Sequence, residues 1–379
     1  MGRHRKPSTF PAGPLVLAGG TGAAVVAVVV GLLVWPEAPA PVESEAVATS
    51  ERTPAPALLP TTPQAPPSVT VAFAGDVHFT GRTEPLLDDP ATAFGSIAQT
   101  LSAADIAMVN LETAITDRGV EEPKEFHFRT SPVALDALHA AGIDLTTMAN
   151  NHAVDYGPLG LQDTLDAVMQ SPIPVIGVGR DAGSAYAPHR VDVRGVTISF
   201  FAASQVPDHT YRAWTATDAS PGIATTADQD RLIAGVGQAS AAGDVVVVYL
   251  HWGIEDEACP TPEMEDLATE LAAAGADAIV GTHAHRLLGA GYLDEPGSTA
   301  FVAYGLGNFL WWRSRAASDS TGVLTLTVQN GTVIASALTP AVIDDTGRPQ
   351  PVIGPQVPDD LASFEELRDC AGLLPTPAV

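Results

Sequence analysis

The run of apolar residues at 244–250 (DVVVVYL) constrains the fold more than any other segment of this sequence. Its four consecutive valines leave no polar face, a pattern typical of a strand that is buried on both sides. Sheets of such strands need helices on their outer faces, and apolar runs do alternate with helix-like segments along this chain. The sequence therefore predicts an α/β fold.

The remaining elements follow from apolar spacing and from turn residues. Short runs rich in β-branched residues predict strands at 69–74, 106–109, 143–148, 175–178, 196–201, 277–281 and 300–304, and a hairpin of 323–328 with 333–338 that turns at Asn330-Gly331. Helical spacing predicts helices at 91–103, 132–141, 157–169, 226–241, 262–274 and 361–370. Residues 204–223 show no clear period, so we expect an irregular excursion there. The hairpin predicts an antiparallel addition late in the chain.

The charge of the chain is divided unevenly. Lys and Arg total 18 against 44 Asp and Glu, which gives a net charge of −26. Residues 1–35 contain Arg3, Arg5 and Lys6 and no carboxylate, so they carry +3 and the remainder carries −29. Binding to phosphates or to an anionic membrane surface needs clusters of Lys and Arg, so the composition argues against a nucleic-acid partner and against peripheral membrane docking.

The N-terminal region predicts a membrane anchor. Residues 15–35 form an uncharged run of 21 residues, long enough to cross a bilayer core of about 30 Å. Basic residues before it and carboxylates after it predict a cytoplasmic tail at 1–13, a single-pass signal anchor at 14–35 in the plasma membrane and an extracytoplasmic remainder. The alternative is a cleaved signal peptide and a secreted protein, but its apolar region is normally shorter than this run.

A linker follows the predicted anchor. Residues 36–68 contain nine prolines, many Ala and Thr, and no apolar periodicity, so we expect this Pro/Ala-rich segment to be disordered and extended. The folded domain is expected to begin near Val69 and to extend to about 340. Residues 341–379 are expected to form a C-terminal extension with one short helix.

Two cysteines, Cys259 and Cys370, lie in the predicted extracytoplasmic part. Two thiols are too few for a disulfide scaffold or a thiolate zinc site. An oxidising compartment favours a single bridge between them, and the alternative is a pair of unpaired buried thiols.

Polar residues that can bind metal follow five of the predicted strands. Ligands of α/β sheets bind beyond the carboxyl ends of strands, so these side chains are expected at one edge. The mixture of carboxylate, amide and imidazole suits divalent metals, and one carboxylate such as Glu112 can bridge two ions. On an extended segment, Asp-x-His and His-x-His place both side chains on one face. The candidates are Asp76, His78, Glu112, Asn150, Asn151, His152, His251, His283 and His285.

Each candidate also has an ordinary structural interpretation. Asp76 could cap a turn, Glu112 could be a solvated loop carboxylate, and His251 could be a core imidazole bonded to a carbonyl. Five predicted strands end in such polar residues, and this repetition favours a metal or metal-like polar site.

The order of these motifs resembles the CapA family, capsule-synthesis proteins associated with poly-γ-glutamate. The resemblance covers roughly 69–340 and rests on Gly75-Asp76, Asn110-Leu111-Glu112, Ala149-Asn150-Asn151-His152 with Asp155-Tyr156-Gly157, His251-Trp252-Gly253, Gly281-Thr282-His283-Ala284-His285 and Gly305-Leu306-Gly307-Asn308-Phe309. That family is in turn similar to the calcineurin-like metallophosphoesterases, which implies a two-sheet α/β/β/α sandwich.

This second resemblance also implies roles for individual residues. Asp76, His78, Glu112 and His285 would bind one metal, with Glu112 as the bridge to the second ion. Asn151, His251 and His283 would complete the second metal, and His152 would be the general acid. The implied cofactors are two divalent ions of the Mn, Fe or Zn type. The bridging residue here is Glu rather than Asp, and Asn-Asn rather than Gly-Asn precedes the histidine.

Further residues are candidates for substrate binding. Arg129 could hold a carboxylate or phosphate bidentately, although it could equally be a surface cation. Asn150 and Asn308 belong to the motifs that carry the resemblance to the CapA family, and they are also predicted to bind substrate. Trp311-Trp312 could form an apolar rim or simply pack.

Two functions remain open from the sequence. The first is a membrane-anchored role in the biosynthesis or export of a capsule or poly-γ-glutamate, together with other membrane capsule-synthesis proteins. The alternative is an extracytoplasmic metal-dependent phosphoesterase or polymer hydrolase unrelated to polyglutamate. The expected substrate is a cell-envelope polymer or a phosphoester, and the sequence leaves open whether the chain is an enzyme.

Overall fold

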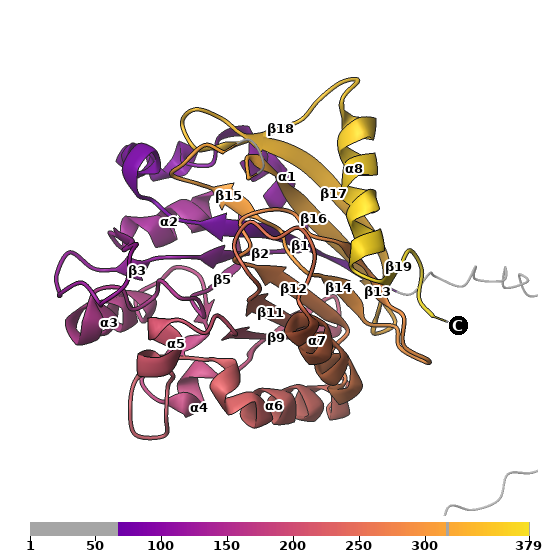
Figure 1. The fold of residues 1–379 in the computed structure, drawn as a ribbon, viewed down its shortest axis with the longest axis horizontal. Coiled ribbons are helices and arrows are strands. Elements are labelled where there is room, and N and C mark those ends of the chain that lie inside the picture. Colours follow the sequence, from indigo (N-terminus) through magenta and orange to yellow (C-terminus); the bar gives the residue numbers. More distant parts are fainter. Residues whose placement is uncertain (1–66, 316–317, 379) are drawn as a thin grey trace, which may run out of the picture. The chain divides into compact units, whose positions relative to one another are not determined.

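A computed structural model of the chain describes residues 67–315 and 318–378, which form two multi-stranded mixed sheets with helices (Figure 1). The predicted tail, the anchor at 14–35 and nearly all of the predicted linker lie outside the described residues. Within the described residues, no helix is both long enough and apolar enough to cross a membrane.

The first sheet contains eight strands. Its order is β18 (Pro349–Pro351), β17 (Thr332–Ile343), β16 (Ser320–Gln329), β1 (Ser68–Val77), β2 (Ile106–Leu111), β5 (Leu145–Thr147) and β6 (Val175–Ile176), and β15 (Asn308–Leu310) also pairs with β1. The strands β1, β2, β5 and β6 run parallel, whereas β16, β17 and β18 are antiparallel. The predicted hairpin is confirmed, and it turns at Asn330 and Gly331, both with positive φ.

The second sheet contains seven strands. Its order is β19 (Leu373–Leu374), β13 (Ala290–Leu293), β14 (Phe301–Ala303), β12 (Ala278–Thr282), β11 (Val245–His251), β9 (Val196–Ser204) and β8 (His189–Val193). Every residue of β11 is buried, which confirms the interpretation of the valine run.

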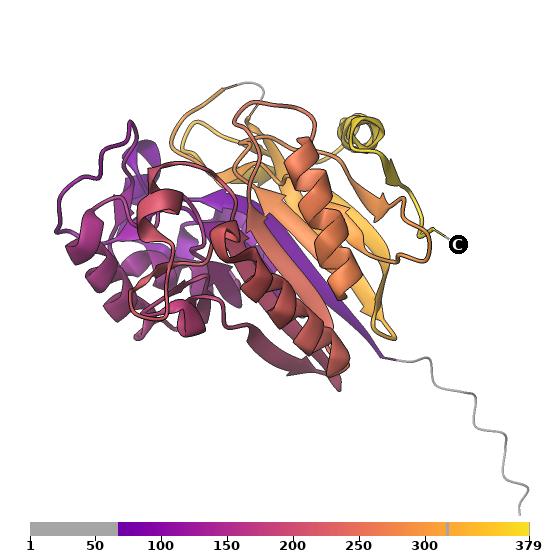
Figure 2. The ribbon, with the colours of Figure 1, turned by 60° about the horizontal axis from the view of Figure 1, so that its bottom comes forward.

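Alternate residues of β11 belong to two different cores. Val247 and Tyr249 point between the sheets, where Tyr249 packs on Phe73 of β1 and donates a hydrogen bond of 2.6 Å to the carbonyl of Ala74. Val246 and Val248 point outward and pack with residues of α6 (Gln229–Ala241) and α7 (Pro262–Ala274). Figure 2 shows these two helices lying along the strands. The two sheets therefore pack face to face, with helices on the outer face of the second.

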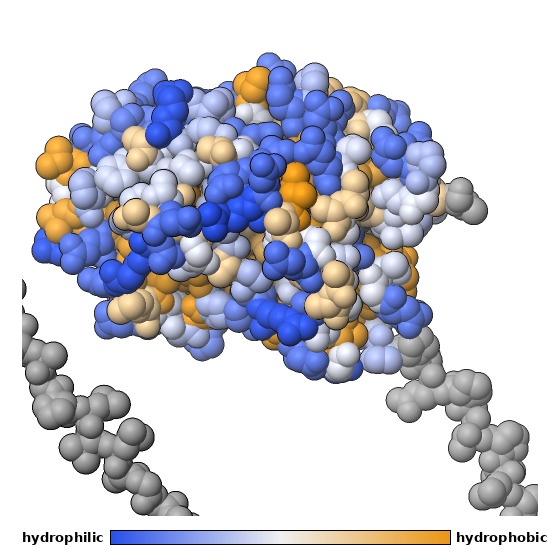
Figure 3. Space-filling view, turned by 90° about the horizontal axis from the view of Figure 1, so that it is seen from below, coloured by the Kyte–Doolittle hydropathy of each residue, from blue (hydrophilic) through white to orange (hydrophobic). Residues whose placement is uncertain are grey.

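The outer face of the first sheet is covered in the same way. Its alanines and valines pack against α1 (Ala98–Leu101), α2 (Val133–Ala140) and α3 (Gly157–Val168). The C-terminal helix α8 (Val357–Cys370) contacts β13 and β17 and inserts Phe364 into the core between the sheets. Residues 341–379 thus supply β18 to one sheet and β19 to the other. The face seen in Figure 3 is a mixture of polar and scattered apolar residues without a broad apolar patch.

An aspartate directly precedes three of the strands, at the end of the sheets where the parallel strands begin. Asp105, Asp144 and Asp277 each accept a hydrogen bond from a backbone N–H of the neighbouring strand, at 2.8–2.9 Å. Each carboxylate satisfies a strand-end amide that the ladder leaves unpaired. The acidic residues at this end therefore serve strand pairing, and those at the opposite end are available for chemistry.

Two expectations about local structure are wrong. Residues 91–103 form short helical pieces, η2 (Pro90–Thr92), η3 (Gly95–Ile97) and α1, because Gly95 adopts a φ of +60° that interrupts a continuous helix. Residues 204–223 contain α5 (His209–Trp214) and β10 (Gly222–Ile223). The Asp208 side chain caps α5 by accepting from the Tyr211 N–H, and the helix is too short to show a period.

The other short elements are η1 (Gly81–Asp88), η4 (Thr226–Asp228) and α4 (Ala182–Ala185), with β3 (Ala114–Ile115) paired to β4 (Arg129–Thr130) and β7 (Val178–Gly179) paired to β10.

Candidate metal centre

The carboxyl ends of the central strands of both sheets meet at one place. In the first sheet Asp76 of β1 stands in register with Asn110 of β2 and Asn308 of β15. In the second sheet His251 of β11 stands in register with Thr282 of β12, directly before His283. The two sets of strand ends face each other, so the tertiary structure brings together residues that lie up to about two hundred positions apart.

Three groups of side chains have ligand atoms that lie within 4.8 Å of one another. They are Glu112, His251 and His283; Asp76, Glu112 and His285; and Glu255, His283 and His285. Glu112, His283 and His285 each belong to two of these groups. Glu255 was not a candidate from the sequence, because it stands four residues after its strand in an exposed loop.

Glu112 is the buried carboxylate at the centre of this cluster. It is 0% exposed, and neither carboxylate oxygen has a hydrogen-bond partner. Its Oε1 lies 3.4 Å from Nε2 of His251. Burial, together with the negative charge of Asp76, raises the pKa of Glu112 well above its usual range. An unpaired buried carboxylate costs several kcal/mol, so the side chain fits a position that holds a cation.

Asp76 is oriented by neighbours from both sheets. Its Oδ1 accepts a hydrogen bond of 2.8 Å from Asn110 Nδ2, and its Oδ2 accepts one of 3.2 Å from the backbone N–H of His283. Burial favours the neutral acid, but His285 and His251 outweigh it and lower the pKa of Asp76. Asp76 therefore remains an ionised carboxylate in a fixed orientation.

The His283 and His285 backbones depart from the expected extended form. β12 ends at Thr282, and the two histidines have φ values of +91° and +59°, in the left-handed region that non-glycine residues rarely adopt. The convergence of the two rings therefore comes from a strained turn and not from strand alternation. Burial opposes protonation of His285, yet Asp76, Glu112 and Glu255 raise its pKa to about 9.

Asn151 and His251 lie side by side in the cluster. Asn151 Oδ1 lies 2.8 Å from His251 Nε2, and His251 Nδ1 contacts Thr282 and Asn110. Burial lowers the pKa of His251 to about 4, so its ring is neutral and able to bind a metal.

His78 is surrounded by aromatic rings and does not belong to any of the three groups of metal-binding side chains. Its ring packs against Phe128 and Trp311, and its Nε2 accepts a hydrogen bond from the Trp312 backbone N–H. Its Nδ1 has no partner, so that atom is the one available to a metal. The role predicted for His78 stays a prediction.

His152 is held by an aspartate that the strand-end pattern does not single out. Its Nδ1 lies 2.7 Å from Asp155 Oδ2, and its Nε2 lies 3.8 Å from Glu112 Oε1. Asp155 also contacts Lys124 Nζ at 2.7 Å. The sequence signal was the segment Asp155-Tyr156-Gly157, which belongs to the family motif but gave Asp155 no role.

Aromatic rings and two guanidinium groups surround the small cavity that opens onto the cluster. The cavity has a volume of about 50 Å³ and is lined by Phe126, Phe128, His152, Glu255, Asp256, His285, Asn308, Trp311, Trp312, Arg313, Arg315 and Ser318. Arg313 stacks on the Trp312 ring at 3.9 Å. Arg315 is paired with Asp256, whereas Arg313 forms no ion pair with another described residue. The Trp311-Trp312 pair thus forms a rim and also packs.

The three predicted substrate-binding residues are placed differently. Asn308 is buried at the cavity, and both polar atoms of its amide lack partners. Asn150 uses its amide to bond Asn110, the Leu111 carbonyl and the His152 N–H, which gives it a structural role. Arg129 stacks on Tyr156 at 4.8 Å and does not line the cavity.

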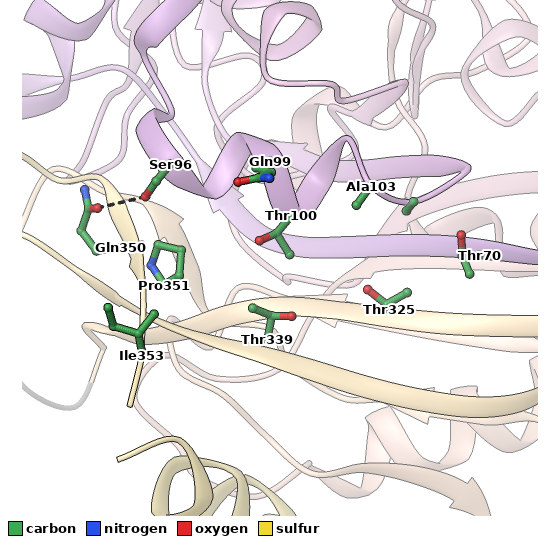
Figure 4. A pocket seen from close by; sticks show the side chains of 11 residues that line it. Thr70, Ser96, Gln99, Thr100, Ala103, Thr325, Thr339, Gln350, Pro351 and Ile353 are labelled. Atoms are coloured by element: carbon green, nitrogen blue, oxygen red, sulfur yellow. Dashed lines mark hydrogen bonds between the residues drawn. The ribbon is translucent and has the colours of Figure 1, made fainter. Parts of the chain in front are cut away.

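A larger groove of about 800 Å³ lies elsewhere, between α1 and the strands β16 to β18 (Figure 4). Its side chains are mostly uncharged hydroxyls and amides, and Ser96 donates to Gln350 across it. This groove offers no metal ligand, so the chemistry is assigned to the smaller cavity.

Carboxylates and imidazoles at the meeting point of two sheets define a candidate centre for divalent cations. The disulfide between Cys259 and Cys370 is present in the structure, as the sequence favoured.

Comparison with known proteins identifies the family of this chain. The chain belongs to the family described as bacterial capsule synthesis protein PGA_cap, whose pattern matches residues 70–311. It is 30% identical to the PGA biosynthesis protein CapA of Bacillus subtilis over 278 residues, which is 70% of this chain and 69% of that protein. It is 28% identical to the capsule biosynthesis protein CapA of Bacillus anthracis over 75% of this chain and 69% of that protein.

Solved structures give weaker similarities. A phosphatase from Mycoplasma pneumoniae aligns over 74% of this chain and 95% of its own, with 16% identity and a TM-score of 0.46. The NAD nucleotidase of Haemophilus influenzae aligns over 83% of this chain and 58% of its own, with 13% identity and a TM-score of 0.45. At these TM-scores the similarities carry no conclusion about activity.

Proposed function

We propose that this protein acts at the cell envelope in the biosynthesis or export of a capsule polymer of the poly-γ-glutamate kind, through a divalent cation centre. Membership of the PGA_cap family supports the biological role. The observation that carries the cation centre is Glu112, a carboxylate without exposure and without partners among the described residues, facing His251 and Asp76.

The location is part of the same proposal. The basic residues before the uncharged run at 15–35 support a single-pass anchor with a cytoplasmic N-terminus. The Cys259–Cys370 disulfide supports an oxidising, extracytoplasmic setting for the folded part. Secretion after signal cleavage is the alternative, and mass spectrometry of the N-terminus of the mature protein distinguishes the two.

The residues of the site would have separate roles. Asp76, Glu112, Asn151, His251, His283 and His285, with His78 through its Nδ1, would hold the cations. Divalent ions at such a site polarise substrate oxygens and lower the pKa of bound water. Asn308 would bond the substrate with its free amide, and Arg313 would attract an anionic group despite the acidic surface of the domain.

A second candidate function is metal-dependent hydrolysis of a phosphoester or of a polymer linkage. The pairing of His152 with Asp155 favours it, because this contact fixes the ring and turns Nε2 toward the cluster. In that geometry His152 would donate a proton to a leaving oxygen. Burial lowers the pKa of His152 well below its usual range, so a carboxylate partner is needed for the ring to carry a proton.

One experiment tests the cation centre and separates the two functions. The full chain, purified in detergent, is dialysed against Mn²⁺ or Zn²⁺ and its metal content is measured. Retention of at least about one ion per chain is expected, and fewer than about 0.2 ions would contradict the centre. Turnover of phosphoester and γ-glutamyl substrates that is lost in His152→Ala would favour hydrolysis, and absence of turnover would favour the assembly role.

A further inference from the structure

The loop between β11 and α7 brings a carboxylate to the solvent side of the cation centre. Glu255 lies four residues after His251, and its ligand atom lies within 4.8 Å of those of His283 and His285. Its Oε1 is 4.0 Å from Nε2 of His285. The side chain is 53% exposed, unlike the buried carboxylates of Asp76 and Glu112. We propose that Glu255 is a further ligand of the divalent cation centre, opposite His283 and His285.

Unpartnered nitrogen atoms in the cluster point to a missing ligand at this position. His283 is 4% exposed, and its Nδ1 has no hydrogen-bond partner. Nδ1 of His285 is likewise buried without a hydrogen bond and lies 3.6 Å from Oδ2 of Asp76, whereas Nε2 of the same ring faces Glu255. A buried imidazole nitrogen normally finds a donor or an acceptor, so two such atoms in a cluster of carboxylates indicate room for a cation.

The backbone of the loop is fixed to the segment that carries the two histidines. The N–H of Asp256 donates to the carbonyl of Ala284, the residue between them, at 3.0 Å. The carbonyl of Asp256 accepts from Arg286 Nη1, also at 3.0 Å. These two bonds hold position 255 across from His283 and His285, so the approach of its carboxylate is set by the fold.

Two more contacts restrain the loop from outside. Arg315 pairs with the Asp256 carboxylate at 3.0 Å, and Cys259 is bonded to Cys370 at the end of α8. Glu255 itself has no Lys or Arg partner among residues 67–315 and 318–378. The neighbouring acidic side chain is thus neutralised by Arg315, and Glu255 is left free to neutralise a cation.

The charges of the cluster make an additional carboxylate reasonable only if a cation is present. Asp76, Glu112 and Glu255 place three carboxylates around His283 and His285, and their like charges repel one another. A divalent ion between them converts this repulsion into attraction. The inference rests on the proposed function, since it assumes the same cation centre.

The test is a Mn²⁺ titration of the full chain, with affinity and stoichiometry measured by the EPR signal of free Mn²⁺. Glu255→Gln removes the carboxylate, and Glu257→Gln is the matched control, because it makes the same charge change in the same exposed loop. We expect Glu255→Gln to weaken binding by about fivefold or more, or to remove one site, and Glu257→Gln to bind like the wild type. The same unfolding midpoint for all three proteins in EDTA shows that folding is unaffected.

The outcomes separate this inference from the proposed function. If the wild type binds Mn²⁺ and Glu255→Gln binds it with less than a fivefold change and equal stoichiometry, the role of Glu255 is overturned and the centre stands. An equal loss in Glu257→Gln also overturns it, because loop charge alone then explains the effect. If the wild type binds neither Mn²⁺ nor Zn²⁺, the centre and this inference are both overturned.

Discussion

Nδ1 of His152 lies 2.7 Å from Oδ2 of Asp155, and this contact fixes the direction of the other ring nitrogen toward Glu112. Asp155 is itself held by Lys124 Nζ at 2.7 Å and by the Phe128 N–H at 2.6 Å. Lys124 lies on the loop after β3, so the orientation of His152 depends on a buried ion pair between two loops.

The first prediction concerns this buried ion pair. Asp155→Asn leaves the Lys124 ammonium, which is 11% exposed, without its closest carboxylate, so we expect the free energy of unfolding to fall by about 2–3 kcal/mol. In a double-mutant cycle with Lys124→Met, the coupling energy is expected to be about 2 kcal/mol.

Denaturant unfolding measures this coupling. The exposed pair Arg180–Asp166 is the control, and Asp166→Asn should cost less than about 1 kcal/mol. A coupling energy between Lys124 and Asp155 no larger than that of the exposed pair would contradict the prediction.

The second prediction separates burial from metal binding at Glu112. In EDTA, Glu112→Gln should be about 1–2 kcal/mol more stable than the wild type, because it removes a buried carboxylate that has no partner. With Mn²⁺ at about 100 times its dissociation constant, the wild type should gain about 2.7 kcal/mol and the variant much less. Thermal unfolding with and without Mn²⁺ measures both differences in stability between the variant and the wild type. Equal stabilisation of the two proteins by Mn²⁺ would rule out Glu112 as a ligand.

The third prediction concerns pH and Asp277, far from the cation centre. Partial burial raises the pKa of Asp277 to about 6, against 3.8 in the unfolded chain. At a pH between these two values the folded state therefore binds more protons than the unfolded state. Stability should therefore rise as pH falls from 7 toward 5. After allowance for partial exposure, we expect Asp277→Asn to be about 1–2 kcal/mol more stable than the wild type at pH 7 and similar to it near pH 4.

Urea unfolding at pH 7, 5.5 and 4 measures this dependence. The amide introduced by Asp277→Asn keeps an oxygen that can accept from the Val246 N–H, so the hydrogen bond is not lost. Asp294→Asn in the exposed segment after β13 is the control for the charge change alone. A constant difference between Asp277→Asn and the wild type across this range would show that the carboxylate does not titrate as expected.

The fourth prediction concerns the disulfide. Cys259 and Cys370 are 111 residues apart, so replacing both with Ser should lower stability by up to about 4–5 kcal/mol in the chain-entropy model. The same change frees the loop that carries Glu255, and Mn²⁺ affinity should fall along with stability. Unfolding and Mn²⁺ titration under native conditions check the two effects, and unchanged Mn²⁺ affinity would show that the other contacts of Asp256 suffice to hold the loop.

Much of the fold could be predicted because its strands carry strong local signals. The valine run at β11 and the turn at Asn330-Gly331 correspond to observed elements, and the helix predicted at 262–274 matches α7. The strands β3, β4, β8, β10, β13, β15, β18 and β19 were missed, since each has five residues or fewer and so carries little local pattern. The helix expected at 91–103 was wrong because a single glycine with positive φ outweighs the spacing of apolar residues.

The candidate site was predicted in outline for a similar reason. Asp76, Glu112, His251, His283 and His285 lie at or shortly after the carboxyl ends of strands, where the general rule for α/β sheets places ligands, and the structure brings them together. Glu255 and Lys124 lie on loops, so nothing local marks them. Arg129 looked suitable by residue type alone, but its side chain stacks on Tyr156 instead.

The sequence by itself determined which residue types stand at the strand ends, where the strands are buried, and that a +3 segment precedes a −29 remainder. These are properties of short segments, and hydrophobic periodicity and charge report them directly. Only the tertiary structure decided which ends meet, which oxygen and nitrogen atoms are left without partners, and which loop covers the centre. Those features depend on the packing of one sheet against the other, a set of contacts between residues far apart in the chain that no local pattern contains.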